Sequence, residues 1–185
     1  MNTRLARIRG FTLLELLMVI AIIAILAAIA IPSVFVTDET RARQAIRELE
    51  RELQTARMKA VTTNRAIQVR LNCPGAGMYR MVEAGTTWPD AGRCSDTTYP
   101  YPAPADAAYQ TPPKPRYDGP TRYLDPNIVL SPGNPNLVIQ FMPDGRTGTY
   151  SGGTVQLINT VQVGVTCRTI SRTVEINGLG RIQVQ

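Results

Sequence analysis

The chain has 185 residues, enough for one membrane segment and one globular domain but too few for a second full domain. Its formal net charge is +6, and Arg4, Arg7 and Arg9, which precede the first acidic residue, supply half of it. The net charge is therefore weak evidence that the folded domain binds nucleic acid. Histidine is absent and the three cysteines form no Cys-x-x-Cys pair, so we expect no metal, no cofactor and no enzymatic activity.

An apolar run of 21 residues follows the basic start, from Phe11 to Ile31, and only Thr12 and Glu15 interrupt it. About 20 apolar residues span a bilayer core as a helix, so residues 11–31 are predicted to cross a membrane once. The arginines ahead of the run place the amino terminus in the cytoplasm and the rest of the chain outside it, by the positive-inside rule.

The stretch RGFTLLEL, residues 9–16, together with the apolar run up to Pro32, resembles the class III signal of type IV prepilins and pseudopilins. The resemblance implies that a prepilin peptidase removes residues 1–10 as a leader by cutting between Gly10 and Phe11, and that Phe11 is then N-methylated. It further implies a single-pass protein of the inner membrane with a periplasmic carboxy-terminal domain, which later joins a filament of other pilins or pseudopilins.

Glu15 is a carboxylate inside the predicted membrane segment. A charge at the centre of such a helix costs about 2.5 to 3.5 kcal/mol, and less near its ends. The α-amino group of a processed subunit, with an ordinary pKa near 8, is a cation that can offset this cost. The resemblance implies that Glu15 forms this salt bridge during assembly; the alternative is that Glu15 reaches the lipid headgroups from the helix end.

Beyond the membrane segment, the pattern from residue 38 to 64 predicts an amphipathic helix, so residues 11–64 are expected to form one long helix. Apolar residues recur three or four apart, and arginines and glutamates occupy the other faces. The apolar positions are Ala42, Ile46, Leu49, Leu53, Ala56 and Ala60.

Residues 65–185 are predicted to form a β-rich periplasmic domain. The alternation in 66–71 and 78–82 predicts a hairpin, because a Pro-Gly turn separates the two runs. Further candidate strands are 127–130, 137–142, 155–158, 161–166, 170–176 and 182–184. A proline-rich loop is expected at about 86–126, where the composition disfavours a sheet ladder. Its tyrosines either form a contact surface for another protein or pack on their own domain; they are Tyr99, Tyr101, Tyr109, Tyr117 and Tyr123.

The order of one helix followed by strands predicts an α+β fold, with the long helix packed on an antiparallel sheet as in pilins. Three later segments resemble the H-type pseudopilins of type II secretion and the FimT/FimU-type minor pilins: 56–69, FMPDGR at 141–146, and INGLGRIQV at 176–184. The resemblance implies a structural minor subunit of a type IV pilus or of the type II secretion pseudopilus, which helps to initiate or cap filament assembly.

DNA binding is the alternative function. Some FimT-type minor pilins bind DNA during natural transformation through a carboxy-terminal G-R-x-R stretch, and this chain reads GRIQ at 180–183, without the second arginine. Arg168, Arg172 and Arg181 are weak candidates for contacts to phosphate. The alternative for these arginines is an ordinary solvated strand face.

Two features outside the helices have simple interpretations. In an oxidising compartment two of the three cysteines could pair, and Cys73 with Cys94 would close a modest loop, but the sequence does not fix the pairing, and Cys167 and the others are equally compatible with buried thiols. Asp118 and Asp144 lie in turn sequences, where aspartate usually accepts hydrogen bonds from the local backbone.

Overall fold

The computed structural model describes residues 12–34, 38–85, 92–104, 118–133 and 137–185, and within the first range it describes the side chains only as far as residue 27. The chain divides into two compact units, Met1–Thr37 and Asp38–Gln185.

The first unit contains the helix α1 (Leu13–Val34). Thr12 caps it, because its Oγ1 accepts a hydrogen bond from the Glu15 N–H at 3.3 Å. Among the helices formed by the described residues, none is both long and apolar enough to cross a membrane. The predicted span, residues 11–31, includes positions outside the described side chains, and it stays a prediction.

The second unit begins with α2 (Asp38–Thr63). All six apolar positions that the sequence pattern placed on one face are buried, which confirms the amphipathic helix. The helix ends at Thr63. The next residue, Asn64, has a left-handed φ of 53°, and the Arg65 N–H donates to the Ala60 carbonyl at 3.1 Å in a C-terminal cap. Residues 35–37 lie outside the described residues, so the continuity of one helix over 11–64 stays a prediction.

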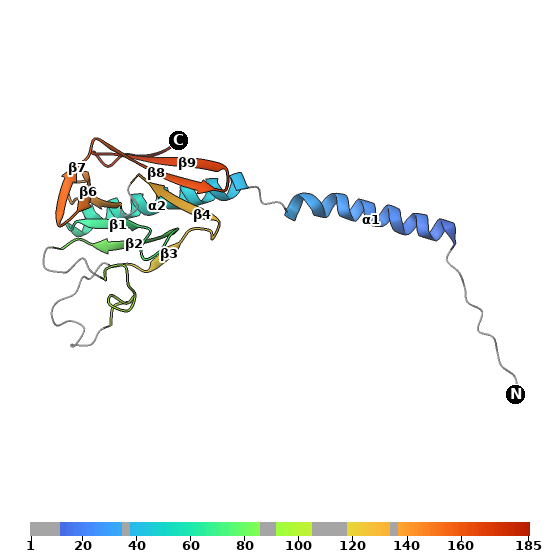
Figure 1. Ribbon diagram of the computed structural model, residues 1–185, viewed down its shortest axis with the longest axis horizontal. Helices are drawn as coiled ribbons and strands as arrows, with labels where there is room; N and C mark the ends of the chain where they lie inside the picture. The colour runs from blue at the N-terminus through green and yellow to red at the C-terminus, as the bar shows by residue number, and fades with distance from the viewer. Residues whose placement is uncertain (1–11, 35–37, 86–91, 105–117, 134–136) are drawn as a thin grey trace, which may run out of the picture. The chain divides into compact units, whose positions relative to one another are not determined.

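Ten strands in the described residues form two antiparallel sheets (Figure 1). The larger sheet has the order β3-β2-β1-β5-β6-β7, and the smaller has the order β10-β9-β8-β4. The strands are β1 (Ile67–Leu71), β2 (Met78–Glu83), β3 (Thr121–Tyr123), β4 (Ile128–Pro132), β5 (Val138–Phe141), β6 (Thr147–Ser151), β7 (Thr154–Leu157), β8 (Thr160–Cys167), β9 (Ile170–Asn177) and β10 (Ile182–Val184).

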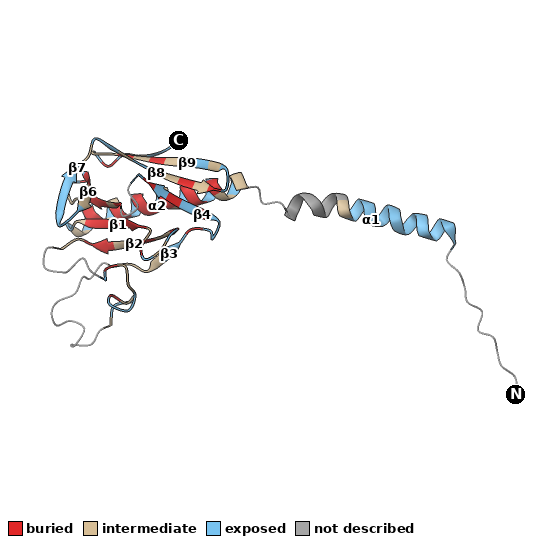
Figure 2. Cartoon of the chain, viewed as in Figure 1, coloured by how far each residue is buried: buried red, intermediate tan, exposed pale blue. Residues whose placement is uncertain are grey.

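The hydrophobic core lies between α2 and the two sheets. Alternate residues of the inner strands point into it, including Val69 and Ile139 of the larger sheet and Val165 and Val174 of the smaller one. Figure 2 shows the buried residues gathered on α2 and on the strands that cover it, and the exposed ones at the sheet edges. The fold is therefore α+β, with a helix on antiparallel sheets, as predicted.

The sequence pattern does not predict two of the strands, β3 and β6. The strand β3 lies inside the stretch expected to be a proline-rich loop, and it pairs with β2, with Arg80 opposite Thr121. Its three residues follow Pro120, and proline is compatible with the start of an edge strand. The strand β6 was missed because its sequence TGTYS lacks the alternation of apolar and polar residues that identifies a strand.

Candidate assembly site

The helix α1 presents an apolar surface without a covering layer. From Leu13 to Leu26 every side chain is exposed within its own unit, including Leu13 at 77% and Leu26 at 61%. A surface of this size in water marks a site for lipid or for another protein. Such a helix is therefore suited to contact lipid or to pack against helices of the same kind.

Glu15 is the one charged side chain among the described residues of α1. Its backbone N–H is held by Thr12, and no described cation lies within ion-pair distance of its carboxylate. Among the described residues, the carboxylate therefore has no cationic partner. Gly10 and Phe11 lie outside the described residues, so the cleavage and the methylation stay predictions.

Two of the three candidate DNA-binding arginines form ion pairs with the start of α2. Arg168 lies 3.3 Å from the Asp38 carboxylate, and Arg172 lies 3.1 Å from that of Glu39. Arg43 also donates a hydrogen bond to Glu39, at 2.6 Å, and it is the largest cause of the lowered pKa of that carboxyl. These pairs attach the amino end of α2 to β9 and to the turn that precedes it.

Arg181 differs from the other two candidates. Its backbone N–H donates to the Asn177 Oδ1 at 2.8 Å, within the turn before β10. Among the described residues no carboxylate lies within ion-pair distance of its guanidinium. Arg181 is thus the one of the three whose charge is not paired with a described carboxylate, so its guanidinium can contact a phosphate.

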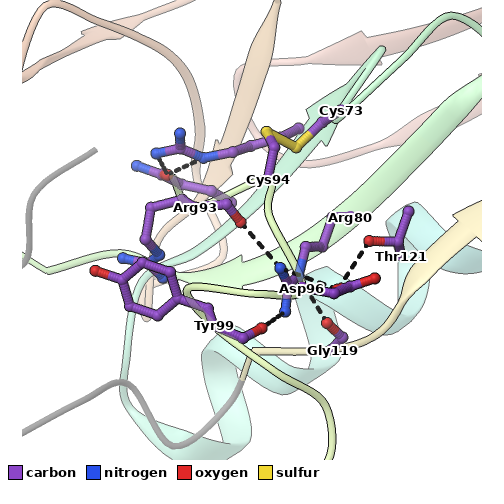
Figure 3. Close-up of a disulfide and its surroundings, with 10 residues drawn as sticks. Cys73, Arg80, Arg93, Cys94, Asp96, Tyr99, Gly119 and Thr121 are labelled. Atoms are coloured by element: carbon purple, nitrogen blue, oxygen red, sulfur yellow. Dashed lines mark hydrogen bonds and ion pairs between the residues drawn. A yellow bond between two sulfur atoms is a disulfide. The ribbon is translucent and has the colours of Figure 1, made fainter. Parts of the chain in front are cut away.

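Two buried arginines attach the segment 92–104 to β2, and a disulfide attaches it to the turn between β1 and β2 (Figure 3). The Arg80 side chain is completely buried and donates to the carbonyls of Gly119 at 2.9 Å and Arg93 at 3.2 Å, and to that of Tyr99. The Asp96 carboxylate, 3.3 Å from the same guanidinium, balances its charge. A buried guanidinium with its donors used in this way fixes the backbone of the loop around it.

Arg93 continues this network from the loop back to the sheet. It is 1% exposed, and its guanidinium lies 5.0 Å from the centroid of the Tyr99 ring. It donates to the Glu83 carbonyl at 2.6 Å and to both Asp118 carboxylate oxygens, at 2.8 and 3.1 Å. The next residue, Cys94, forms a disulfide with Cys73, while Cys167 is a free buried cysteine.

These contacts correct one interpretation of the sequence. Asp118 was expected to bond its local backbone, but it accepts hydrogen bonds from Arg93 and from the Glu83 N–H at 2.7 Å, both distant in sequence. Asp144 does behave as expected, because it accepts from the Arg146 N–H at 3.0 Å. No sequence signal identified Arg80 or Arg93, since an arginine in an alternating strand or a loop is usually solvated.

The three described tyrosines of the loop region differ in exposure. Tyr99 is buried at 4% exposure, whereas Tyr101 and Tyr123 are 57% and 69% exposed. Tyr109 and Tyr117 lie outside the described residues. Packing on the domain therefore holds for Tyr99 alone among the three that are described.

Arg57 of α2 belongs to the first of the three segments that resemble H-type pseudopilins, 56–69. It lies next to residues of the other two, 141–146 and 176–184. Its guanidinium donates to the Leu179 carbonyl at 3.1 Å. Gly180 has a φ of +77°, and a Cβ there would lie 2.4 Å from the Gly145 carbonyl oxygen and 2.6 Å from the Arg57 Nε. The glycine is required both by its conformation and by this close approach.

Two parts of the chain each match a known protein family or motif. Residues 5–31 match the prokaryotic N-terminal methylation motif, and residues 45–180 match the family described as type II transport protein GspH. The chain belongs to the GspH family. Its members are pilin-like structural subunits and not enzymes, so this GspH-family chain is a pilin-like protein that assembles with other pilins in a filament.

The solved structure of a type IV minor pilin supports the fold of this GspH-family chain, and a second solved structure is similar to it. The type IV minor pilin FimU of Pseudomonas aeruginosa has a TM-score of 0.51 at 16% identity, over 80% of this chain and 91% of FimU. The minor pseudopilin EpsH of the Vibrio cholerae type 2 secretion system has a TM-score of 0.46 at 8% identity, over 78% of this chain and 96% of EpsH. No curated protein matches the chain significantly.

Proposed function

We propose that the chain is a minor subunit of a type IV pilus or of a type II secretion pseudopilus, and that it helps to initiate or cap filament assembly. The observation that carries the proposal is the exposed apolar surface of α1 with a single carboxylate near its start. The match of residues 5–31 to the methylation motif supports maturation at Gly10 and Phe11 by a prepilin peptidase.

In this proposal the subunit is anchored in the inner membrane before assembly, with residues 11–31 across the bilayer and residues 65–185 in the periplasm. Glu15 is costly in lipid while it lacks a partner. In the filament it meets the amino group of Phe11 on a neighbouring subunit, where opposite charges in a dry environment attract strongly. Transfer from lipid into the filament is thus favourable only beside another subunit.

Substitution at Glu15 tests this proposal. Glu15→Gln keeps the size of the side chain and removes its charge, and Glu39→Gln is a matched control because that carboxylate is exposed on α2 and paired within the domain. We expect Glu15→Gln to lower the amount of chain in sheared filaments at least about tenfold, which corresponds to about 1.4 kcal/mol. Equal incorporation of the two variants would contradict the proposal.

The number and length of filaments distinguish the two roles. Deletion of an initiating subunit lowers the number of filaments, whereas deletion of a capping subunit leaves their number unchanged and alters their length. The fraction in which the chain occurs, surface pili or secretion pseudopili, distinguishes the two machines. A deletion that alters neither number nor length would contradict both roles.

DNA binding has weaker support as a second function. The Asp38 and Glu39 carboxylates already neutralise Arg168 and Arg172, which leaves Arg181 as the main candidate contact. A protein that contacts phosphates loses affinity steeply as salt rises. Gel-shift titrations at two salt concentrations test this: binding that weakens with salt and is lost in Arg181→Ala would support DNA uptake, and no binding at low salt would exclude it.

A further inference from the structure

The outer edge of β7 differs from the other sheet edges of the second unit. Edge strands are usually protected from pairing with other chains by proline, by charge or by shortness. The strand β3 follows Pro120 and carries Arg122, β4 includes Pro132, and β10 has three residues. The strand β7, with the sequence TVQL, has neither charge nor proline, and all four residues are exposed (Figure 2).

The register of the hairpin determines which groups of β7 face outward. Ser151 and Thr154 are opposite each other across the two-residue turn Gly152-Gly153, so they form the first hydrogen-bonded pair. Hydrogen-bonded and non-hydrogen-bonded pairs alternate along an antiparallel ladder. The N–H and C=O groups of Val155 and Leu157 therefore point away from β6, and no backbone hydrogen bond joins them to another described residue.

Apolar side chains lie beside this open backbone. Val155 and Leu157 share one face of β7 because side chains alternate along a strand, and they are 37% and 61% exposed. Leu157 and Leu179, the latter 73% exposed, line an open hollow of about 340 Å³ together with Arg146, whose charge is paired with Asp144. The edge thus combines main-chain groups that no described residue pairs with and a place for an apolar side chain.

We propose that the outer edge of β7 receives an extended, uncharged segment of a different pilin-type subunit of the filament, which adds a strand to the larger sheet. Only an extended backbone satisfies the alternating N–H and C=O groups of such an edge. The absence of charge from Thr154 to Leu157 selects an uncharged segment, and an apolar side chain of that segment occupies the hollow beside Leu179. This inference rests on the proposed function, because a filament supplies the neighbouring subunit.

Cross-linking of the full chain in its own cells tests the proposal. A photoreactive phenylalanine analogue replaces Leu179, and adducts from the filament fraction are identified by mass spectrometry. We expect an adduct with a different pilin-type subunit. Val155→Pro removes an N–H that faces outward and leaves the bonds to β6 in place, so it should lower the adduct about tenfold.

Val155→Ala is the matched control, because it shortens the side chain but keeps the N–H. The adduct should stay within about twofold of the wild type if main-chain pairing holds the partner. Leu157→Lys, which keeps every backbone group and adds a charge to the edge, should also lower the adduct about tenfold if the partner segment is uncharged. Thermal unfolding of each variant verifies that the domain is folded.

Three outcomes would overturn the proposal: an adduct that Val155→Pro and Leu157→Lys leave unchanged, an adduct with a second copy of this chain alone, or no adduct from a chain that is present in filaments. Absence of the wild-type chain from filaments would instead overturn the proposed function, and this inference with it. Filament incorporation measured in the same cells separates these cases.

Discussion

The buried ion pair between Arg93 and Asp118 should contribute more to stability than any exposed pair of the domain. The two side chains are 1% and 7% exposed, and Asp118 also accepts the Glu83 N–H. Asp118→Ala leaves a buried guanidinium and a buried amide without this acceptor, and breaking such a pair costs about 3 to 5 kcal/mol. The exposed pair of Asp144 and Arg146, at 47% and 53%, provides the comparison.

The assay is urea unfolding of the full chain in detergent micelles, with the disulfide intact, followed by far-ultraviolet circular dichroism. We expect Asp118→Ala to lower the free energy of unfolding by about 3 to 5 kcal/mol and Asp144→Ala by about 1 kcal/mol or less. The double variant Asp118→Ala/Arg93→Met should recover part of the loss, since it removes the unpaired charge. Equal losses in the two single variants, or no recovery in the double variant, would refute the reasoning.

Three further predictions concern other parts of the domain. Cys94→Ser opens a disulfide that spans a sequence separation of 21 residues, so it should lower the free energy of unfolding by about 3 kcal/mol, and a loss below about 1 kcal/mol would contradict this. The hydrogen bond and the charge of Arg43 lower the pKa of Glu39, so the contribution of Glu39 to stability is present above its ordinary pKa and is lost as pH falls through the lowered one. In an NMR titration the pKa of Glu39 should rise in Arg43→Ala, and an unchanged value would contradict the assignment. Gly180→Ala should cost about 1 to 3 kcal/mol in urea unfolding because of its φ of +77°, whereas Gly133→Ala, where a Cβ meets nothing within 4 Å, should cost less than Gly180→Ala.

The sequence contained enough information to predict the fold class and most elements. The stripe from Ala42 to Ala60 has the helical period, and the alternation in β8 and β9 has the strand period, so both patterns reflect burial on one face. The sequence does not predict β6, because the position of this strand in the sheet depends on pairing with β5 and not on apolar side chains of its own. Local patterns identify elements that bury a face, and they miss those that are defined by backbone pairing.

The candidate site was predictable only in part, for a related reason. The motif around Glu15 is contiguous in sequence, so it can be recognised without a structure. The network of Arg80, Arg93 and Asp118 depends on segments that come together only in the folded domain, and each residue type by itself predicts a solvated position. The open edge of β7 likewise follows from the register of its hairpin and from the position of β7 at the end of the sheet order.

The most direct test of the central claim is the intact mass of the chain recovered from filaments of cells with a working prepilin peptidase. A pilin-type subunit that is processed after Gly10 and assembled through Glu15 should begin at N-methylated Phe11. A filament fraction in which the chain retains the ten residues of the leader, beginning with Met1, would contradict the account.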